Sequence, residues 1–223
     1  MDYPTGAGTV PAVTDTPAPT DPAPAPARTG QPIAVWVLAF AAMVSFMGIG
    51  LVDPILKSIA ANLDATPSEV SLLFTSYLLV TAIAMLITSF VSSRFGGRTT
   101  LMAGLVIIIV FSTLAGTSDS VAALVGWRAG WGLGNALFIA TALAAIIAVA
   151  RGGAEKAVTL YEAALGVGIS VGPLVGALLG TVNWRAPFFG VAVLMGIALL
   201  AISLFLKDKV TVTHRIRPAD PLR

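Results

Sequence analysis

Three ionisable residues of this 223-residue chain lie within or beside long uncharged stretches: Asp53, Arg128 and Glu162. Placing an arginine at the centre of a bilayer costs about 2.5 to 3.5 kcal/mol on insertion scales, so such residues are usually functional. A fixed cation attracts a carboxylate less once that carboxylate takes up a proton. These residues therefore predict a proton-driven charge switch, in which Arg128 responds to Asp53 or Glu162.

Each of the three residues also has a simpler interpretation, and the sequence leaves both open. Arg128 could extend its charged head to the outer headgroups. Asp53 precedes Pro54 and could cap a break in a helix. Glu162 could hold its carboxylate in water at the membrane surface. We expect Asp53 and Arg128 to share the outer half of the protein and Glu162 to lie nearer the cytoplasmic side.

One helical turn separates Trp127 from Trp131, and another separates Trp131 from Asn135. Rings on one helix face can stack on a flat cation, and the asparagine can add a hydrogen bond. This spacing predicts a substrate cavity lined by Trp131 and Asn135. The alternative is a belt of aromatic residues at the membrane surface, which we favour for Trp127. The sequence does not decide between the two for Trp131 and Asn135.

A serine-nucleophile pattern occurs at residues 168–172, which read Gly-Ile-Ser-Val-Gly. The serine would need a base beside it, usually a histidine. The one histidine, His214, follows the last apolar stretch, and the chain has no cysteine to act as a nucleophile or metal ligand. There is also no Gly-x-x-x-x-Gly-Lys-Ser/Thr loop for ATP. We therefore expect no enzyme and no cofactor or metal.

The elements that position these residues are six uncharged stretches, each close to the length of about 20 residues that spans a bilayer. They are residues 33–52, 70–93, 99–118, 129–150, 163–184 and 186–206. The fourth and fifth are expected to begin earlier, which takes Arg128 and Glu162 into the membrane. Apolar residues make up 57% of the chain and charged residues 11%, which excludes a soluble globular protein. The prediction is an all-α membrane protein with six transmembrane helices.

Local signals refine these helices. Apolar residues at helical spacing continue past Pro54, so the first helix should continue beyond a kink at Asp53-Pro54. Residues 66–69, Thr-Pro-Ser-Glu, have the form of a capping box that starts the second helix. Because the loops are short, sequential helices are expected to pack as antiparallel neighbours.

The distribution of Lys and Arg predicts the orientation, because these residues accumulate in short cytoplasmic loops. With the N-terminus inside, the outer side receives only Lys57 and Arg185. The inner side receives ten: Arg28, Arg94, Arg98, Arg151, Lys156, Lys207, Lys209, Arg215, Arg217 and Arg223. Both termini should therefore be cytoplasmic, in a cell inner (plasma) membrane. The basic residues are dispersed among loops, which argues against a nucleic-acid partner.

Two tails flank the six-helix bundle at 33–206. Residues 1–32 hold eight of the 14 prolines with many Ala and Thr residues, and this composition predicts a disordered cytoplasmic tail with polyproline II character. The tail lacks the basic start and apolar core of a secretory signal, so the first span should be retained. Residues 207–223 form a basic cytoplasmic tail.

A stripe of glycines, Gly168, Gly172, Gly176 and Gly180, recurs every four residues with Pro173 among them. A helix face without side-chain bulk lets another backbone approach closely, and such faces are a main way in which helices associate inside a membrane. The stripe therefore predicts a partner helix.

Three motifs give the chain a resemblance to the drug:proton antiporter branch of the major facilitator superfamily. Residues 93–98 resemble the loop motif Asp-Arg-x-Gly-Arg-Arg, and Arg94, Gly96 and Arg98 match it, although Ser93 and Gly97 depart from it. Residues 128–134 resemble the fourth-helix motif Arg-x-x-Gln-Gly-x-Gly, with Arg128 matching and Trp131 in place of Gln. Residues 168–176 fit the fifth-helix antiporter motif Gly-x-x-x-Gly-Pro-x-x-Gly through Gly168, Gly172, Pro173 and Gly176.

The resemblance implies the N-terminal half of a twelve-helix transporter, folded as an inverted repeat of helices one to three against four to six. It implies proton-coupled efflux of small amphipathic compounds across the lipid bilayer, once a second six-helix half or a homodimer partner completes the cavity. In the family the fifth-helix glycines pack near a helix of the other half, so the stripe is expected to be an unmet interface. The alternative is a non-transporting truncated product, or a membrane interaction subunit that docks through this glycine face.

Overall fold

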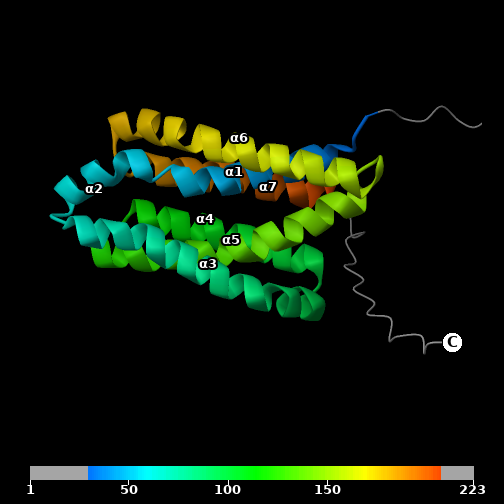
Figure 1. Cartoon of the computed structure of the whole chain (residues 1–223), viewed down its shortest axis with the longest axis horizontal. Coiled ribbons are helices and arrows are strands. Elements are labelled where there is room, and N and C mark those ends of the chain that lie inside the picture. The colour runs from blue at the N-terminus through cyan, green and yellow to red at the C-terminus, as the bar shows by residue number, and fades with distance from the viewer. Residues whose placement is uncertain (1–29, 207–223) are drawn as a thin grey trace, which may run out of the picture.

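The computed structural model describes residues 30–206, and within them every regular element is a helix (Figure 1). The elements are α1 (Ile33–Gly50), the 3₁₀ turn η1 (Asp53–Ile55), α2 (Leu56–Asn62), α3 (Pro67–Phe95), α4 (Gly97–Gly116), α5 (Val121–Val149), α6 (Gly153–Val182) and α7 (Ala186–Phe205). Counting α1, η1 and α2 as one, six helical stretches are long and apolar enough to span a membrane, as predicted. The predictions for residues 1–29 and 207–223, including His214, lie outside the described residues.

The local predictions for the first two helices are confirmed. α1 stops at Gly50, η1 forms at Asp53-Pro54, and α2 continues the helix beyond this break. At the start of α3, the Glu69 amide donates to Thr66 Oγ1 over 3.3 Å, while Glu69 Oε2 accepts from the Thr66 amide over 2.8 Å. This reciprocal pair is the predicted capping box.

The fourth and fifth spans begin earlier than their uncharged stretches, as expected. α5 starts at Val121, after Ser120, whose side chain accepts from the amide of Ala123. α6 starts at Gly153, after a turn in which Gly152 has φ +91°. Arg128 and Glu162 therefore both lie inside spans.

The six spans pack as two layers. α6, α1, α5 and α3 lie next to one another in that order, and α7 and α4 pack on α1, α5 and each other. Figure 1 shows α6 and α3 at opposite edges of the molecule. The expectation that sequential helices are neighbours is correct for α4 and α5 but wrong for α3 with α4 and for α6 with α7, which touch little. A short loop joins helix ends only, whereas the side chains along each helix decide which faces pack.

The packing follows an inverted repeat of three spans. If the first three spans (α1, α3, α4) are exchanged in order with the last three (α5, α6, α7), the α1·α6 pair becomes α5·α3. The α4·α5 pair becomes α7·α1. The same exchange leaves the α4·α7 and α1·α5 pairs unchanged. Because consecutive spans cross the membrane in opposite directions, this exchange also inverts the repeat, which is the predicted 3+3 arrangement.

The glycine stripe of α6 is occupied by α1, so the prediction that it is an unmet interface is wrong. Gly168, Gly172 and Gly176 are buried, and a Cβ atom on Gly172 would lie 2.6 Å from the nearest carbonyl oxygen of α1. The carbonyl oxygens that the three glycines face in turn are those of Met43, Met47 and Leu51. The stripe does receive a partner helix, but that helix belongs to the same chain.

Glycines also bring α5 close to its neighbours α4 and α3. A Cβ on Gly104 of α4 would lie 2.8 Å from the carbonyl oxygen of Gly134 on α5, and one on Gly134 would lie 2.9 Å from that of Gly104. On the opposite side, Gly132 faces the Tyr77 carbonyl of α3 at 2.5 Å by the same measure. α5 is therefore held between α4 and α3, which fixes the side chains it directs into the core.

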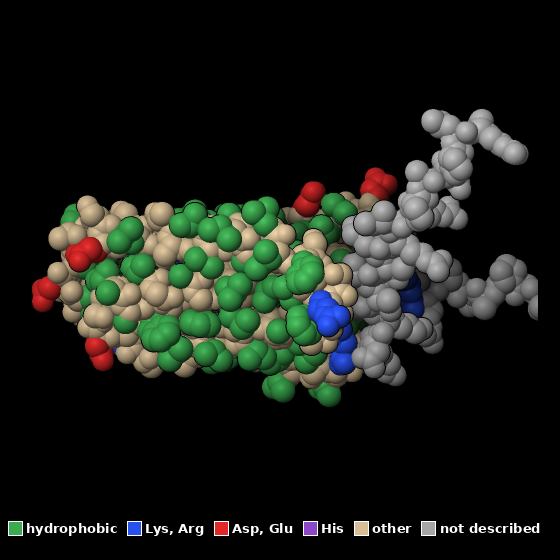
Figure 2. Space-filling model, turned by 90° about the horizontal axis from the view of Figure 1, so that it is seen from below, with side chains coloured by type: hydrophobic (Ala, Val, Ile, Leu, Met, Phe, Trp, Pro, Cys, Tyr) green, Lys and Arg blue, Asp and Glu red, His purple; other side chains and the backbone are tan. Residues whose placement is uncertain are grey.

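The surface matches a membrane protein. Figure 2 shows apolar side chains over the middle of one face, with charged side chains gathered toward the two ends. Several large apolar residues are highly exposed, such as Leu86 at 83% and Phe90 at 73% on α3. Such exposure suits contact with lipid tails.

Candidate functional site

Arg128 is buried inside the bundle, about two turns from the start of α5, with no exposed surface. Its Nε donates to the Leu73 carbonyl of α3 over 3.4 Å, and its Nη1 donates to the Gly48 carbonyl of α1 over 3.3 Å. The side chain therefore joins three helices, and the interpretation that it extends to the outer headgroups is wrong. α5 sits between α1 and α3, so the shortest path for this side chain leads to their carbonyl oxygens.

The break in α1 makes the Gly48 carbonyl available to Arg128. The last carbonyls of a helix have no partner within it. In α1, which ends at Gly50, the Met47 carbonyl still accepts from the Leu51 amide over 3.1 Å, while the next carbonyl along, that of Gly48, accepts from the guanidinium. The helix break at Asp53-Pro54 thus provides a hydrogen-bond acceptor for the buried Arg128 guanidinium.

Two aromatic rings enclose the guanidinium. Its Cζ lies 4.4 Å from the centroid of the Tyr77 ring and 4.8 Å from that of the Trp131 ring. Cation–π contacts of this kind contribute about 2 kcal/mol or more when water is excluded. The indole fits here because position 48 is glycine: a Cβ there would lie 2.8 Å from Trp131 Cζ2.

Asn135 continues this cluster one turn further along α5. Its Nδ2 donates to Tyr77 Oη over 2.5 Å, and its Oδ1 accepts from Ser45 Oγ of α1. Trp131 and Asn135 are both fully buried. In the described part of the chain, Trp131 faces the Arg128 guanidinium and Asn135 cross-links α1, α3 and α5, so a role in a substrate cavity stays a prediction.

Sequence reasoning missed Tyr77, Ser45 and Gly48 as parts of this cluster. A polar side chain inside an apolar span was the available signal for Tyr77 and Ser45, but many serines and threonines share it. Gly48 carries no signal of its own, because its role is to leave room for Trp131 and to offer a carbonyl.

The cluster retains unused donors. Within residues 30–206, no acceptor partners the buried Nη2 of Arg128 or Nε1 of Trp131. The guanidinium is held by carbonyl oxygens and rings, and no carboxylate contacts it in this part of the chain. A buried charge without an opposite charge is costly, so the cluster would gain from an approaching anion.

The two candidate carboxylates lie apart from this cluster. Asp53 is exposed in η1 and forms no ion pair with Arg128. Glu162 is exposed on α6 and does not contact Arg128.

The loop-motif residues lie at one end of the bundle, away from Arg128. Gly96 is the single residue between α3 and α4 and has φ +86°, a conformation that favours glycine. Arg94 is exposed in the last turn of α3. Arg98 Nη2 donates to the Ser203 carbonyl near the end of α7 over 3.4 Å.

The opposite end of the α4·α7 pair has a matching arginine. Arg185, just before α7, donates to the Gly116 carbonyl at the end of α4 over 3.1 Å. It also pairs with Asp119 over 3.1 Å and lies 4.5 Å from the ring centroid of Trp184. Each end of the pair therefore joins an arginine at the start of one helix to a terminal carbonyl of the other, where a cation is electrostatically favoured.

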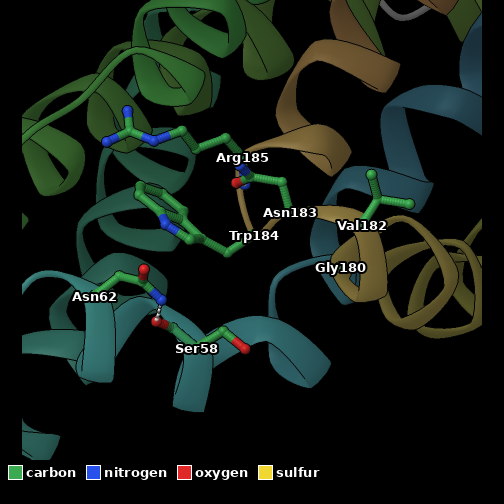
Figure 3. A pocket seen from close by; sticks show the side chains of 7 residues that line it. All are labelled: Ser58, Asn62, Gly180, Val182, Asn183, Trp184 and Arg185. Carbon is green, nitrogen blue, oxygen red and sulfur yellow. Dashed lines mark hydrogen bonds between the residues drawn. The ribbon is translucent and has the colours of Figure 1, made fainter.

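A polar cavity of about 390 Å³ lies beside this end, between α2 and the α6–α7 turn (Figure 3). Ser58 and Asn62 line it from α2, and Asn183, Trp184 and Arg185 line it from the turn. None of the predicted site residues reaches this cavity.

Comparison with known proteins decides the family. The sequence model described as Major Facilitator Superfamily matches residues 38–223. The chain belongs to this superfamily of transporters. It is 61% identical over 193 residues to the multidrug efflux protein YfmO of Bacillus subtilis (strain 168), an alignment that covers 86% of this chain and 49% of the relative. It is 31% identical over 187 residues to a tetracenomycin C resistance and export protein of Streptomyces glaucescens, covering 81% and 34%.

Solved structures show the same fold. A peptide transporter, POT, in complex with sulfate superposes with a TM-score of 0.72 at 17% identity, covering 87% of this chain and 42% of that one. The proton:xylose symporter XylE gives a TM-score of 0.66 at 16% identity, covering 79% and 44%. The chain is thus a multi-pass membrane protein homologous to multidrug efflux transporters, and it spans about half the length of YfmO.

Proposed function

We propose that this chain is one half of an exporter that uses the proton gradient to move small amphipathic compounds across the inner membrane. The observation that carries the proposal is the 61% identity to a multidrug efflux protein. Because that match covers 49% of the relative, the active assembly would include a second six-helix half, supplied as another chain or as a second copy.

The exposed face of α6 supports such an assembly. Small residues share one stripe, and large apolar residues share another. The small stripe holds Gly166, Ser170, Pro173 and Ala177, and the large one holds Val167, Leu174, Leu178 and Val182. Small-residue stripes suit close contact with a helix, whereas large apolar side chains suit lipid.

The other edge helix, α3, also carries a face that includes small residues, although large apolar residues interrupt it. Its exposed small residues include Ser71, Thr75, Ala82 and Ser89, with Leu78 exposed among them, and the exposed large residues beside this face include Leu72, Leu79, Leu86 and Phe90. Since α3 and α6 are the two edges of one layer, a second half would contact this chain at both edges. These faces replace the buried glycine stripe as the proposed interface.

The proposed coupling links Asp53 to the Arg128 cluster. Protonation of Asp53 would remove its attraction for the guanidinium, which bonds the carbonyl at the break in α1. Loosening that hold would shift the balance between two conformations of the first span. Glu162 lies on the small-residue side of α6, so we propose it as a second proton site, open to a cavity between the halves.

The proposed orientation places both termini in the cytoplasm. Among the described residues, Arg94, Arg98, Arg151 and Lys156 lie in or beside the cytoplasmic turns of this topology, and Lys57 and Arg185 lie toward the outer end. This asymmetry agrees with the positive-inside rule. The loop-motif residues Arg94, Gly96 and Arg98 would then act at the cytoplasmic entrance.

Reconstitution tests the proposal. The full chain is purified alone and after co-expression with a second six-helix half, and each preparation is placed in proteoliposomes for dye efflux driven by a pH gradient. The proposal predicts efflux from an assembly of two halves, hetero- or homodimeric, and none from a monomer. A monodisperse monomer that binds no second half and moves no dye would leave a non-transporting product or an interaction subunit.

Substitutions in the active assembly test the coupling. Asp53→Asn and Glu162→Gln should each change the pH dependence of efflux, whereas Lys57→Gln, a neighbouring control near Asp53, should not. Arg128→Ala should abolish coupling. Normal proton coupling in all three variants would refute the charge-switch hypothesis.

A further inference from the structure

An apolar groove of about 300 Å³ runs between the N-terminal halves of α1 and α6. Trp36, Phe40 and Met43 line it from α1, and Leu160, Ala164 and Val167 line it from α6. Within residues 30–206, every side chain that lines the groove is apolar. Trp36, at 58% exposed, stands open at its edge.

The groove opens toward lipid and away from the proposed interface between halves. On α6, Leu160, Val167 and Leu174 follow one another at intervals of seven residues, so the groove continues into the large apolar stripe. Glu162 and the small-residue stripe that begins at Gly166 lie on a different face. The natural occupant of this groove is therefore a component of the bilayer.

A lysine stands at the end of the groove. Lys156 precedes Leu160 by one helical turn and shares its face. Since Gly172 lies against Met47, α1 and α6 run parallel in a fixed register, and Trp36 is level with Tyr161. Lys156 is therefore about five residues, roughly 7 Å, beyond the indole toward the end of the bundle.

The ammonium group of Lys156 is available. The side chain is exposed, and within residues 30–206 no acidic residue pairs with it. Its stem lies beside Gly152: a Cβ there would be 2.7 Å from Lys156 Cδ. Along the membrane normal, the groove is thus followed by the Trp36 indole at its edge and then by the Lys156 ammonium group.

We propose that this groove binds one acyl chain of an anionic phospholipid, with Lys156 holding the phosphate and Trp36 lying at the level of the headgroup. Tryptophan favours this depth, and a basic residue near the surface attracts anionic lipid. This is a lipid-binding site on the half bundle itself, and it does not depend on transport or on a second half.

Quenching of Trp36 fluorescence tests the site. The full chain is placed in phosphatidylcholine nanodiscs that contain a minor fraction of either brominated phosphatidylglycerol or brominated phosphatidylcholine. The Trp36→Phe variant, measured in parallel, gives the contribution of the other tryptophans. We expect the Trp36 signal to report about a five-fold preference for the anionic lipid, the effect of one lysine near the surface.

Matched variants separate the site from general lipid contact. Lys156→Gln should abolish the preference, while Lys57→Gln, which removes one charge at the other end, should keep it. Ala163→Phe should fill the groove and lower quenching by either lipid, while Val193→Phe, on the lipid-exposed face of α7, should not. Equal quenching by both lipids, or a preference that survives Lys156→Gln, would overturn the proposal. Because both leaflets contain the probe, the result is independent of orientation and of efflux.

Discussion

Gly172→Ala should destabilise the isolated chain, because the added methyl group has no room. Its Cβ would lie 2.6 Å from the Met47 carbonyl oxygen, whereas ordinary contact begins at 3.4 Å. α1 and α6 would have to separate by several tenths of an ångström at their closest approach, and the obstacle is backbone. Overpacking of this kind costs about 1 to 3 kcal/mol in the free energy of unfolding.

The same helix provides a matched control. Gly166 has nothing within 4 Å of the position its Cβ would take. Gly166→Ala should therefore leave stability unchanged or raise it by up to about 1 kcal/mol, since alanine favours a helix over glycine. Both variants can be measured by reversible unfolding of the full chain in mixed micelles of mild detergent and dodecyl sulfate, followed by circular dichroism.

The comparison also separates two roles for the glycine stripe. If Gly172 packs against α1, the alanine variant is destabilised without any second half present. If the stripe instead packs against a second half, the isolated Gly172→Ala variant should have the wild-type free energy of unfolding. It should then be defective only in assembly with that half. Equal stability of Gly172→Ala and Gly166→Ala would refute the close packing of α6 on α1.

Three further outcomes can be measured in the same unfolding assay. Arg128→Lys should lower the free energy of unfolding by about 1 to 3 kcal/mol, because an ammonium cannot reproduce the fork of donors to two carbonyls or the ring contacts. A free energy of unfolding equal to that of the wild type would contradict a stabilising role for the Arg128 cluster. Gly96→Ala should cost about 1 to 3 kcal/mol from φ +86° alone, since nothing crowds its Cβ position, and Gly126→Ala, equally uncrowded, should not. Asp119→Asn should change stability by less than about 1 kcal/mol, because the carboxylate is 92% exposed. A larger loss would show that the Arg185–Asp119 ion pair contributes more to stability than its exposure suggests.

The sequence located Arg128 on its helix, but it did not determine what surrounds the neighbouring residues of that helix. Arg128 matched the fourth-helix motif, and the structure makes it the most buried charge of the described chain. Trp131 and Asn135 were predicted to line a cavity because they follow Trp127 at intervals of one helical turn. Whether that face of α5 meets a cavity or another helix depends on α1 and α3, which come from distant parts of the chain.

The sequence by itself determined the number of spans, the start of α3 and the break at Asp53-Pro54. These features depend on local physics: the length of an uncharged run, a capping box and a proline that cannot continue the hydrogen bonds of a helix. Each can be recognised from a window of a few residues. The position of Arg128 inside a span follows from the same reasoning.

Only the tertiary structure decided which helices are neighbours. In lipid an apolar face gains little by leaving the acyl chains, so hydropathy does not rank one helix pairing above another. The choice depends on how closely two backbones can approach and which polar groups then meet. Gly172 against Met47 and Arg128 against the Gly48 carbonyl are such matches, and both join residues that lie far apart in sequence.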